Sequence, residues 1–147
     1  MIAVVALVGA GLAYPRLNTH ERHLIGWRDI TAKLGPVRWP VQVVSVIHSR
    51  EKLQKILAHT IPEGTPRAPA VDYRRREAIL IALGPRSSTG YDLRVVRITE
   101  SSRIFVVLRE RTPRLGQHVT PMLTFPYRLI TIPHTDKKVR FHIIGRL

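Results

Sequence analysis

The stretch EAILIALGPRSSTGYDLRVVRIT, residues 77–99, contains two predicted strands and the turn between them. Its first part is a continuous apolar run ending at Gly84, which is typical of a strand buried on both faces. Its last part alternates apolar and polar residues, as a half-exposed strand does, and the adjacent Val95 and Val96 predict a β-bulge. Between them, Gly84 and Gly90 can adopt positive φ angles, and Pro85 cannot donate to a β-ladder. The stretch therefore predicts a β structure with a sharp internal connection.

Further strand patterns lie on both sides of this stretch. They cover residues 40–48, 103–111, 127–132 and 138–144. Most are joined by short connections, and because parallel pairing needs a long crossover, we expect antiparallel neighbours. The predicted fold class is mainly β (α+β), an antiparallel β-sandwich or open barrel with one short N-terminal helix.

That helix is predicted at residues 50–59, within SREKLQKILAHT. Ser49 is a favourable N-cap, because its hydroxyl can accept a hydrogen bond from a free amide of the first turn. Leu53, Ile56 and Leu57 then form one apolar stripe. The following residues 61–70 contain three prolines and one glycine, which predicts an extended linker.

The N-terminal residues predict export. Residues 2–14 carry no charge, which matches the apolar part of a signal peptide but is shorter than the ~20 residues of a bilayer span. We expect residues 1–17 to be a signal peptide or a membrane-anchor remnant, with a buried first strand as the alternative. Residues 18–40 form a weakly patterned extension, with a turn of helix expected within residues 18–27, and residues 41–147 form the β domain. The expected localisation is extracytoplasmic, either secreted or in the cell envelope, with residues 2–14 as the candidate membrane tether.

The composition is strongly basic and free of cysteine. The formal net charge is +14, with 24 Lys and Arg against 10 Asp and Glu. Such a chain attracts polyanions. The densest cluster is Arg74, Arg75 and Arg76, which is either a basic patch that binds a polyanion or a solvated strand edge that discourages aggregation. The absence of cysteine excludes disulfides, thiolate zinc sites and a cysteine nucleophile.

No pattern in the chain predicts catalysis. His20 and His23 are three residues apart, whereas a zinc-protease helix places its histidines four apart. Ser88, Asp92 and His118 could be drawn together as a triad, but no nucleophile elbow surrounds any serine. We therefore predict no catalytic residues, no metal site and no cofactor, and the protein is not expected to be an enzyme.

Several segments follow one another in the order and spacing of a known family. They are VDY at 71–73, the apolar strand that ends in Gly84, STGYD at 88–92 and TFPYRLITIP at 124–133. With these segments, residues 41–142 resemble the PrcB C-terminal domain family, which is named after an accessory subunit of a secreted bacterial protease complex. The family turn usually contains Pro-Thr-Gly-Gly-Tyr, whereas Ser87, Ser88 and Thr89 occupy its first three places here.

The resemblance implies a non-catalytic, exported accessory or binding module that helps assemble or stabilise a protease or envelope complex. The expected partner is a protein, such as a secreted or membrane-associated protease. Ser88, Thr89, Gly90 and Tyr91 are the predicted partner-binding residues, although the same loop also suits a purely structural turn with Tyr91 capping the core. Two alternative functions stay open. One is a basic domain that binds nucleic acid or an anionic polymer, and the other is a peptidase inhibitor that acts through residues 87–91, where the turn resembles the loop of chagasin-type inhibitors.

Overall fold

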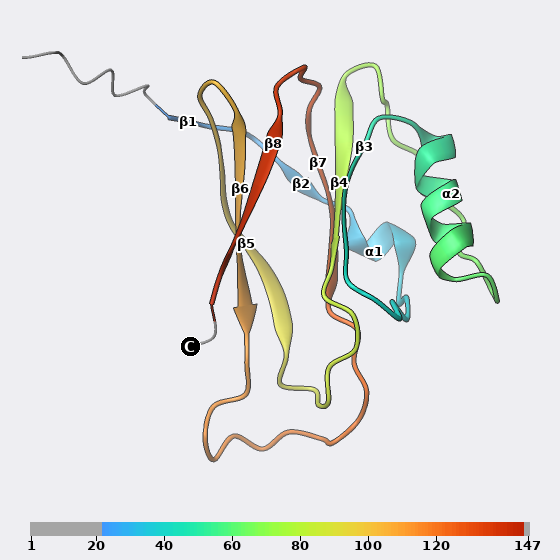
Figure 1. Cartoon of the computed structure of the whole chain (residues 1–147), viewed down its shortest axis with the longest axis vertical. Helices are drawn as coiled ribbons and strands as arrows, with labels where there is room; N and C mark the ends of the chain where they lie inside the picture. The colour runs from blue at the N-terminus through green and yellow to red at the C-terminus, as the bar shows by residue number, and fades with distance from the viewer. Residues whose placement is uncertain (1–21, 146–147) are drawn as a thin grey trace, which may run out of the picture.

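The computed structural model describes residues 22–145 and places two four-stranded sheets face to face, with a helical layer on one side (Figure 1). Sheet A has the order β1 (His23–Leu24), β5 (Asp92–Glu100), β6 (Ile104–Arg111), β8 (Val139–Ile144). Sheet B has the order β2 (Arg28–Asp29), β7 (Tyr127–Pro133), β4 (Arg76–Ala82), β3 (Val43–Ile47). The helices are α1 (Thr31–Leu34) and α2 (Arg50–Thr60). The sheets do not close into a barrel, so of the two predicted architectures the sandwich is confirmed.

Strand β4 is the centre of the fold because it contributes to two cores. Ile79 and Ile81 pack between the two sheets, and Leu80 packs on the opposite face, under α2. All three side chains are fully buried. This confirms the prediction made from the continuous apolar run, and it gives the molecule three layers: sheet A, sheet B and the helical layer. In Figure 1 these layers follow one another from left to right.

Helix α2 begins where the sequence predicts. The Ser49 hydroxyl accepts a hydrogen bond from the backbone N–H of Lys52 at 3.1 Å, and Leu53 and Leu57 are fully buried. The linker that follows is fixed along this helix, because the Gln54 side chain donates to the carbonyl of Pro66 at 3.1 Å and accepts from the N–H of Ala68 at 2.9 Å. The linker is therefore part of the packed helical layer.

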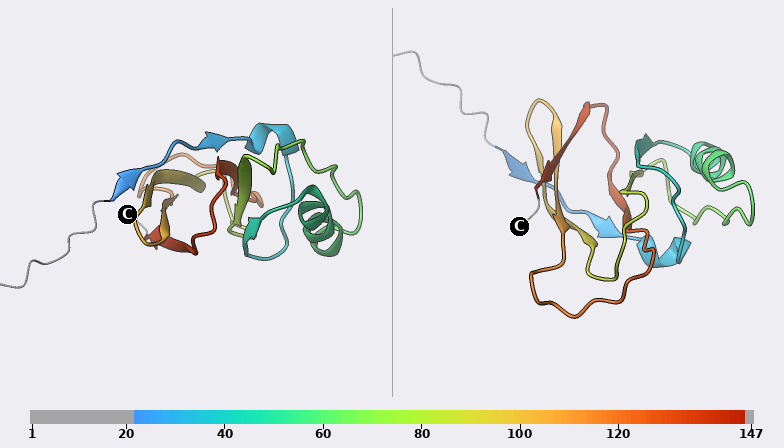
Figure 2. Two further views of the ribbon diagram at one scale, coloured as in Figure 1. Left: turned by 90° about the horizontal axis from the view of Figure 1, so that it is seen from above. Right: turned by 60° about the horizontal axis from the view of Figure 1, so that its bottom comes forward.

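The prediction of antiparallel neighbours is wrong for β8, which pairs with β6 in parallel. The reason is that short connections in this fold often join different sheets. β7 belongs to sheet B and β8 to sheet A, so the turn at residues 134–138 crosses the sandwich. Residues 83–91 and 112–126 cross in the same way, and Figure 2 shows the longer of these connections running below both sheets. Only strands in one sheet are forced to be antiparallel by a short turn. The predicted bulge is confirmed by the register shift between Val95 and Arg97.

The N-terminal extension contains more structure than the sequence predicts. Its first described residues are extended and supply β1 to sheet A and β2 to sheet B, so the expected turn of helix near residues 18–27 is wrong for the described part. Helix α1 follows. The described residues therefore contain two helices, whereas the sequence predicted one. The Tyr127 hydroxyl donates to the carbonyl of Gly35, and Trp39 is fully buried. The predicted signal peptide or anchor at residues 1–17 lies outside the described residues. Within residues 22–145, no helix has the length and apolar character needed to cross a bilayer.

Candidate interaction surface

The outer face of sheet A carries a dense set of arginines. Alternation along the strands sends Leu93, Ile98, Val106 and Leu108 into the core between the sheets. The registers place the residues of the outer face, of which Thr99 and Val107 are buried, in rows across β5, β6 and β8. These rows are Thr99–Phe105–Arg140, Arg97–Val107–His142 and Arg94–Arg109–Ile144. We call the following set the arginine face: Arg22, Arg94, Arg97, Arg103, Arg109, Arg111 and Arg140, all of which are exposed.

The arginine face is poorly neutralised. Arg94 forms an ion pair with Asp92 at 3.2 Å, and the other six arginines form no ion pair with any residue that the structure describes. Arg94 and Arg109 stand directly opposite each other on adjacent strands, an arrangement in which like charges are destabilising. Two hollows open on this side, of about 450 Å³ beside Phe105 and about 520 Å³ beside Arg94 and Arg109. The sequence signal of this face is the spacing of Arg94 and Arg97 in β5 and of Arg109 and Arg111 in β6, but no pattern within one strand predicts that they lie together.

The predicted partner-binding loop is packed against the connection between β6 and β7. The Thr89 N–H donates to the carbonyl of Thr120 at 3.1 Å, and the Thr124 hydroxyl donates to the carbonyl of Ser88 at 2.8 Å. Ser88 and Gly90 are buried, whereas Thr89 is exposed and Tyr91 is half-buried. A partner at this loop would therefore touch Thr89 and Tyr91, and a contact role for the loop stays a prediction.

The two glycines of this connection have different roles. Gly84 has a φ of 76°, as expected. Gly90 does not have a positive φ, so that expectation is wrong. Gly90 is required by close packing instead, since a Cβ there would lie 2.6 Å from Cγ of Pro113 and 2.7 Å from Cγ1 of Val119.

The three consecutive arginines do not share one environment. Arg74 and Arg75 lie exposed in the turn before β4. Arg76 begins β4, and its guanidinium donates to the Thr131 hydroxyl at 2.9 Å and to the Thr131 carbonyl at 2.7 Å. Burial, with a further contribution from Arg28, lowers the pKa of Arg76. The solvated-edge interpretation is wrong, because β4 lies between β7 and β3. Polyanion binding by this cluster stays a prediction.

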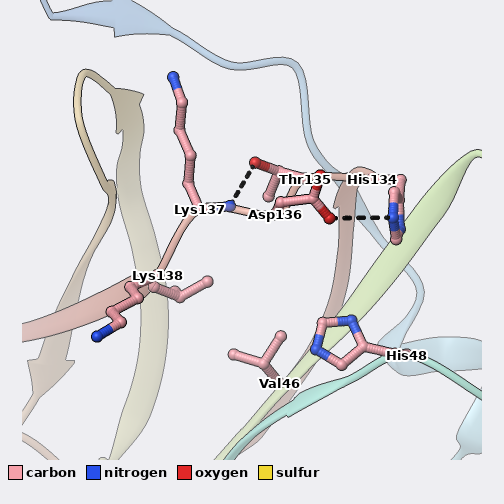
Figure 3. Close-up of a pocket in the computed structure, with 8 residues that line it drawn as sticks. Val46, His48, His134, Thr135, Asp136, Lys137 and Lys138 are labelled. Atoms are coloured by element: carbon pink, nitrogen blue, oxygen red, sulfur yellow. Dashed lines mark hydrogen bonds and ion pairs between the residues drawn. The ribbon is translucent and has the colours of Figure 1, made fainter.

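A cavity of about 480 Å³ opens between the edge strands β3 and β8, and Figure 3 shows the side chains around it. His48 follows β3, and His134 follows β7, with its Nε2 atom 4.0 Å from the carboxylate of Asp136. Beside this cavity Glu77 is buried on the inner face of β4. Nδ1 of His48 lies 3.1 Å from Oε2 of Glu77, but neither carboxylate oxygen has a hydrogen-bond partner among the described residues. Sequence patterns did not single out this glutamate.

Replacing Glu77 with glutamine should make stability less dependent on pH. Burial raises the pKa of the Glu77 carboxyl above its ordinary value, and His48 and His134 offset this only in part. A raised pKa in the folded state means that the carboxyl favours folding below its ordinary pKa and that this contribution is lost as pH rises through the folded value. The stability of Glu77→Gln relative to the wild type should therefore increase as pH rises above the ordinary pKa of a glutamate carboxyl. Urea unfolding at several pH values measures this difference, and a difference that stays constant would contradict it.

The comparisons with known proteins agree with the predicted resemblance over the centre of the chain. The model of the PrcB C-terminal family matches residues 78–133. This range contains nearly all of β4, the whole of β5 and β6, the connections between them and β7. No curated protein and no solved structure matches the chain significantly.

Proposed function

We propose that this protein is a non-catalytic, exported accessory module that binds a protein partner and helps assemble or stabilise a protease or envelope complex. The observation that carries the proposal is the family match over residues 78–133, since that family suggests an accessory domain related to a protease complex. The match includes strands of both sheets and two of the connections that cross between them, at residues 83–91 and 112–126. Export is supported by the uncharged residues 2–14.

A second observation that supports protein binding is the end of the sandwich formed by the connections at residues 83–91 and 112–126, which we call the lower rim (Figure 1). The connection at residues 112–126 exposes three large apolar side chains: Leu115, Met122 and Leu123, of which the last is 65% exposed. Thr89 and Tyr91 lie on the neighbouring connection, which is hydrogen bonded to this one. Large apolar side chains exposed on one connection are typical of surfaces that bind proteins.

The proposal is tested by capture from the envelope fraction of the source cells. Tagged full-length protein should enrich a peptidase, or a subunit of a peptidase complex, as identified by mass spectrometry. Leu123→Asp should weaken this enrichment, whereas Leu24→Asp, at an exposed position of β1 remote from the rim, should not. Capture of no peptidase component would reject the proposal. Turnover of a substrate by the purified protein, lost on a single substitution, would reject its non-catalytic part.

A further inference from the structure

We propose that the arginine face of sheet A is a docking surface for a carboxylate-rich surface of a protein partner. The inference rests on the proposed function only for the nature of that partner, a component of a protease or envelope complex. The docking surface lies on the outer face of sheet A, whereas the apolar rim lies on the connections at one end of the sandwich. The two surfaces can therefore be tested separately.

The first argument is the charge of the face. Six of its seven arginines form no ion pair with a described residue, so they are available to an external anion. Asp92 offsets part of the charge of Arg94, but Arg109 stands directly opposite Arg94 with no ion pair to a described residue, and such like charges are destabilising. A carboxylate placed between these two guanidiniums would remove that repulsion and accept hydrogen bonds from both. Binding of an acidic group is therefore favoured at this point of the sheet.

The second argument is the chemistry of the cations. The cationic side chains of the face are all arginines, and no lysine side chain lies in its three rows. The planar guanidinium fork binds carboxylates with two parallel hydrogen bonds, which a lysine ammonium cannot do. Arginine is also enriched in protein–protein interfaces, where lysine is depleted. The composition of the face therefore fits a protein interface better than a general electrostatic surface.

The third argument distinguishes a protein from nucleic acid. Single-stranded nucleic acid usually stacks several bases on aromatic side chains of a sheet. Among the described residues, the three rows of the face contain one phenyl ring, Phe105, and one imidazole, His142. Phe105 is half-buried and carries the guanidinium of Arg22 at 5.0 Å from its centroid. Between the arginines lie Val96, which is 44% exposed, and the partly covered Ile144. Apolar contacts interspersed with arginine suit a folded protein surface.

Direct binding with two probes of equal charge tests the inference. One probe is a fluorescent peptide of alternating glutamate and glycine, and the other is an oligothymidylate with the same number of negative charges. At ~0.15 M salt, where surface electrostatics are largely screened beyond ~8 Å, the full chain should bind the peptide more tightly than the oligonucleotide. Arg97→Glu with Arg140→Glu should weaken peptide binding by about tenfold or more, since truncation of one such contact costs about one factor of ten or more.

The matched control is Lys55→Glu with Arg67→Glu, which changes the net charge equally at exposed positions of the helical layer, away from sheet A. This control should bind the peptide as the wild type does, and far-UV circular dichroism checks that both variants are folded. Equal losses in the two variants would overturn the inference, because binding would then follow net charge alone. Tighter binding of the oligonucleotide, lost with Arg97 and Arg140, would also overturn it, since the face would then serve nucleic acid.

The two proposals can fail independently. If the wild type and the Arg97→Glu/Arg140→Glu variant capture the same peptidase equally from the envelope fraction, the docking inference is wrong and the proposed function stands. If neither captures a peptidase, but only the wild type binds the acidic peptide, the proposed function is wrong and the acidic docking surface stands.

Discussion

Trp39→Ala should destabilise the protein by about 3–5 kcal/mol, the usual cost of truncating a large buried aromatic side chain. Trp39 is fully buried in the core under α2. Its ring lies 5.8 Å from the Tyr127 ring at an interplanar angle of 57°, a tilted arrangement that aromatic pairs favour. Removing the indole would leave a large cavity at the junction of the N-terminal extension and sheet B. Urea unfolding measured by circular dichroism gives the change in the free energy of unfolding.

Trp39→Phe is the matched control for this prediction. The indole Nε1 atom is buried and has no hydrogen-bond partner among the described residues. Phenylalanine keeps most of the apolar volume and removes this unpaired donor, whose burial is itself costly. The phenylalanine variant should therefore lose less than half as much stability as the alanine variant. Equal losses in the two variants would contradict the prediction, because the packed apolar volume at this position would then not determine the stability.

Gly90→Ala should destabilise the protein by about 1–3 kcal/mol, the typical cost of forcing extra atoms into a packed site. The new methyl group would lie 2.6 Å and 2.9 Å from two side-chain carbons of Pro113 and 2.7 Å from Cγ1 of Val119. Neither neighbour is a long flexible side chain that could move aside. The connections at residues 83–91 and 112–126 would therefore be pushed apart. Thermal unfolding of the variant measures the loss.

Gly26→Ala provides the comparison, because a Cβ at Gly26 meets no atom within 4 Å and its φ is not positive. This variant should unfold close to the wild type. A wild-type stability for Gly90→Ala would mean that the two connections are not in close contact in solution. In that case the loop at residues 88–91 would be free to act as the projecting partner-binding loop that the sequence suggests.

The parts of the fold that the sequence predicts well are those with local causes. The unbroken apolar run of β4 identifies a strand with two buried faces, whatever covers them. Ser49 identifies the start of α2 because its hydroxyl needs only the amides of the next turn. The adjacent Val95 and Val96 identify the bulge because alternation fails there. Each of these signals is complete within a few residues.

The parts that the sequence does not predict depend on distant partners. Strands β1 and β2 are each two residues long, which is too short for a sequence pattern to predict them. They are strands because they pair with β5 and β7. The parallel pairing of β8 with β6 arises because a short turn crosses between sheets, and turn length does not show which sheet comes next. The long connection that contains Val119 covers Gly90, so its burial could not be seen in the turn motif itself.

The same distinction between local and distant causes applies to the candidate interaction surfaces. The exposed character of Arg140 follows from alternation within its own strand. Its position beside Phe105, and that of Arg94 opposite Arg109, follows only from the registers of the strands. The three consecutive arginines were the obvious cluster in the sequence, yet the start of β4 turns Arg76 toward Thr131 and separates it from the other two.

The chain crosses between the sheets four times within the described residues, at 25–27, 83–91, 112–126 and 134–138, and these crossings have a consequence for cooperativity. Apart from the β5–β6 hairpin, the strand pairs of sheet A and the β4–β7 pair of sheet B join segments that are distant in the chain. The contacts between these distant strands of one sheet therefore cannot form while the other sheet is unfolded. Topologies dominated by such contacts fold slowly, on the scale of milliseconds to seconds. Trp27 packs against the core between the sheets, and Trp39 lies in the core under α2. Probes of these two tryptophans should report one shared melting event, and two separate events would show that the layers come apart one at a time.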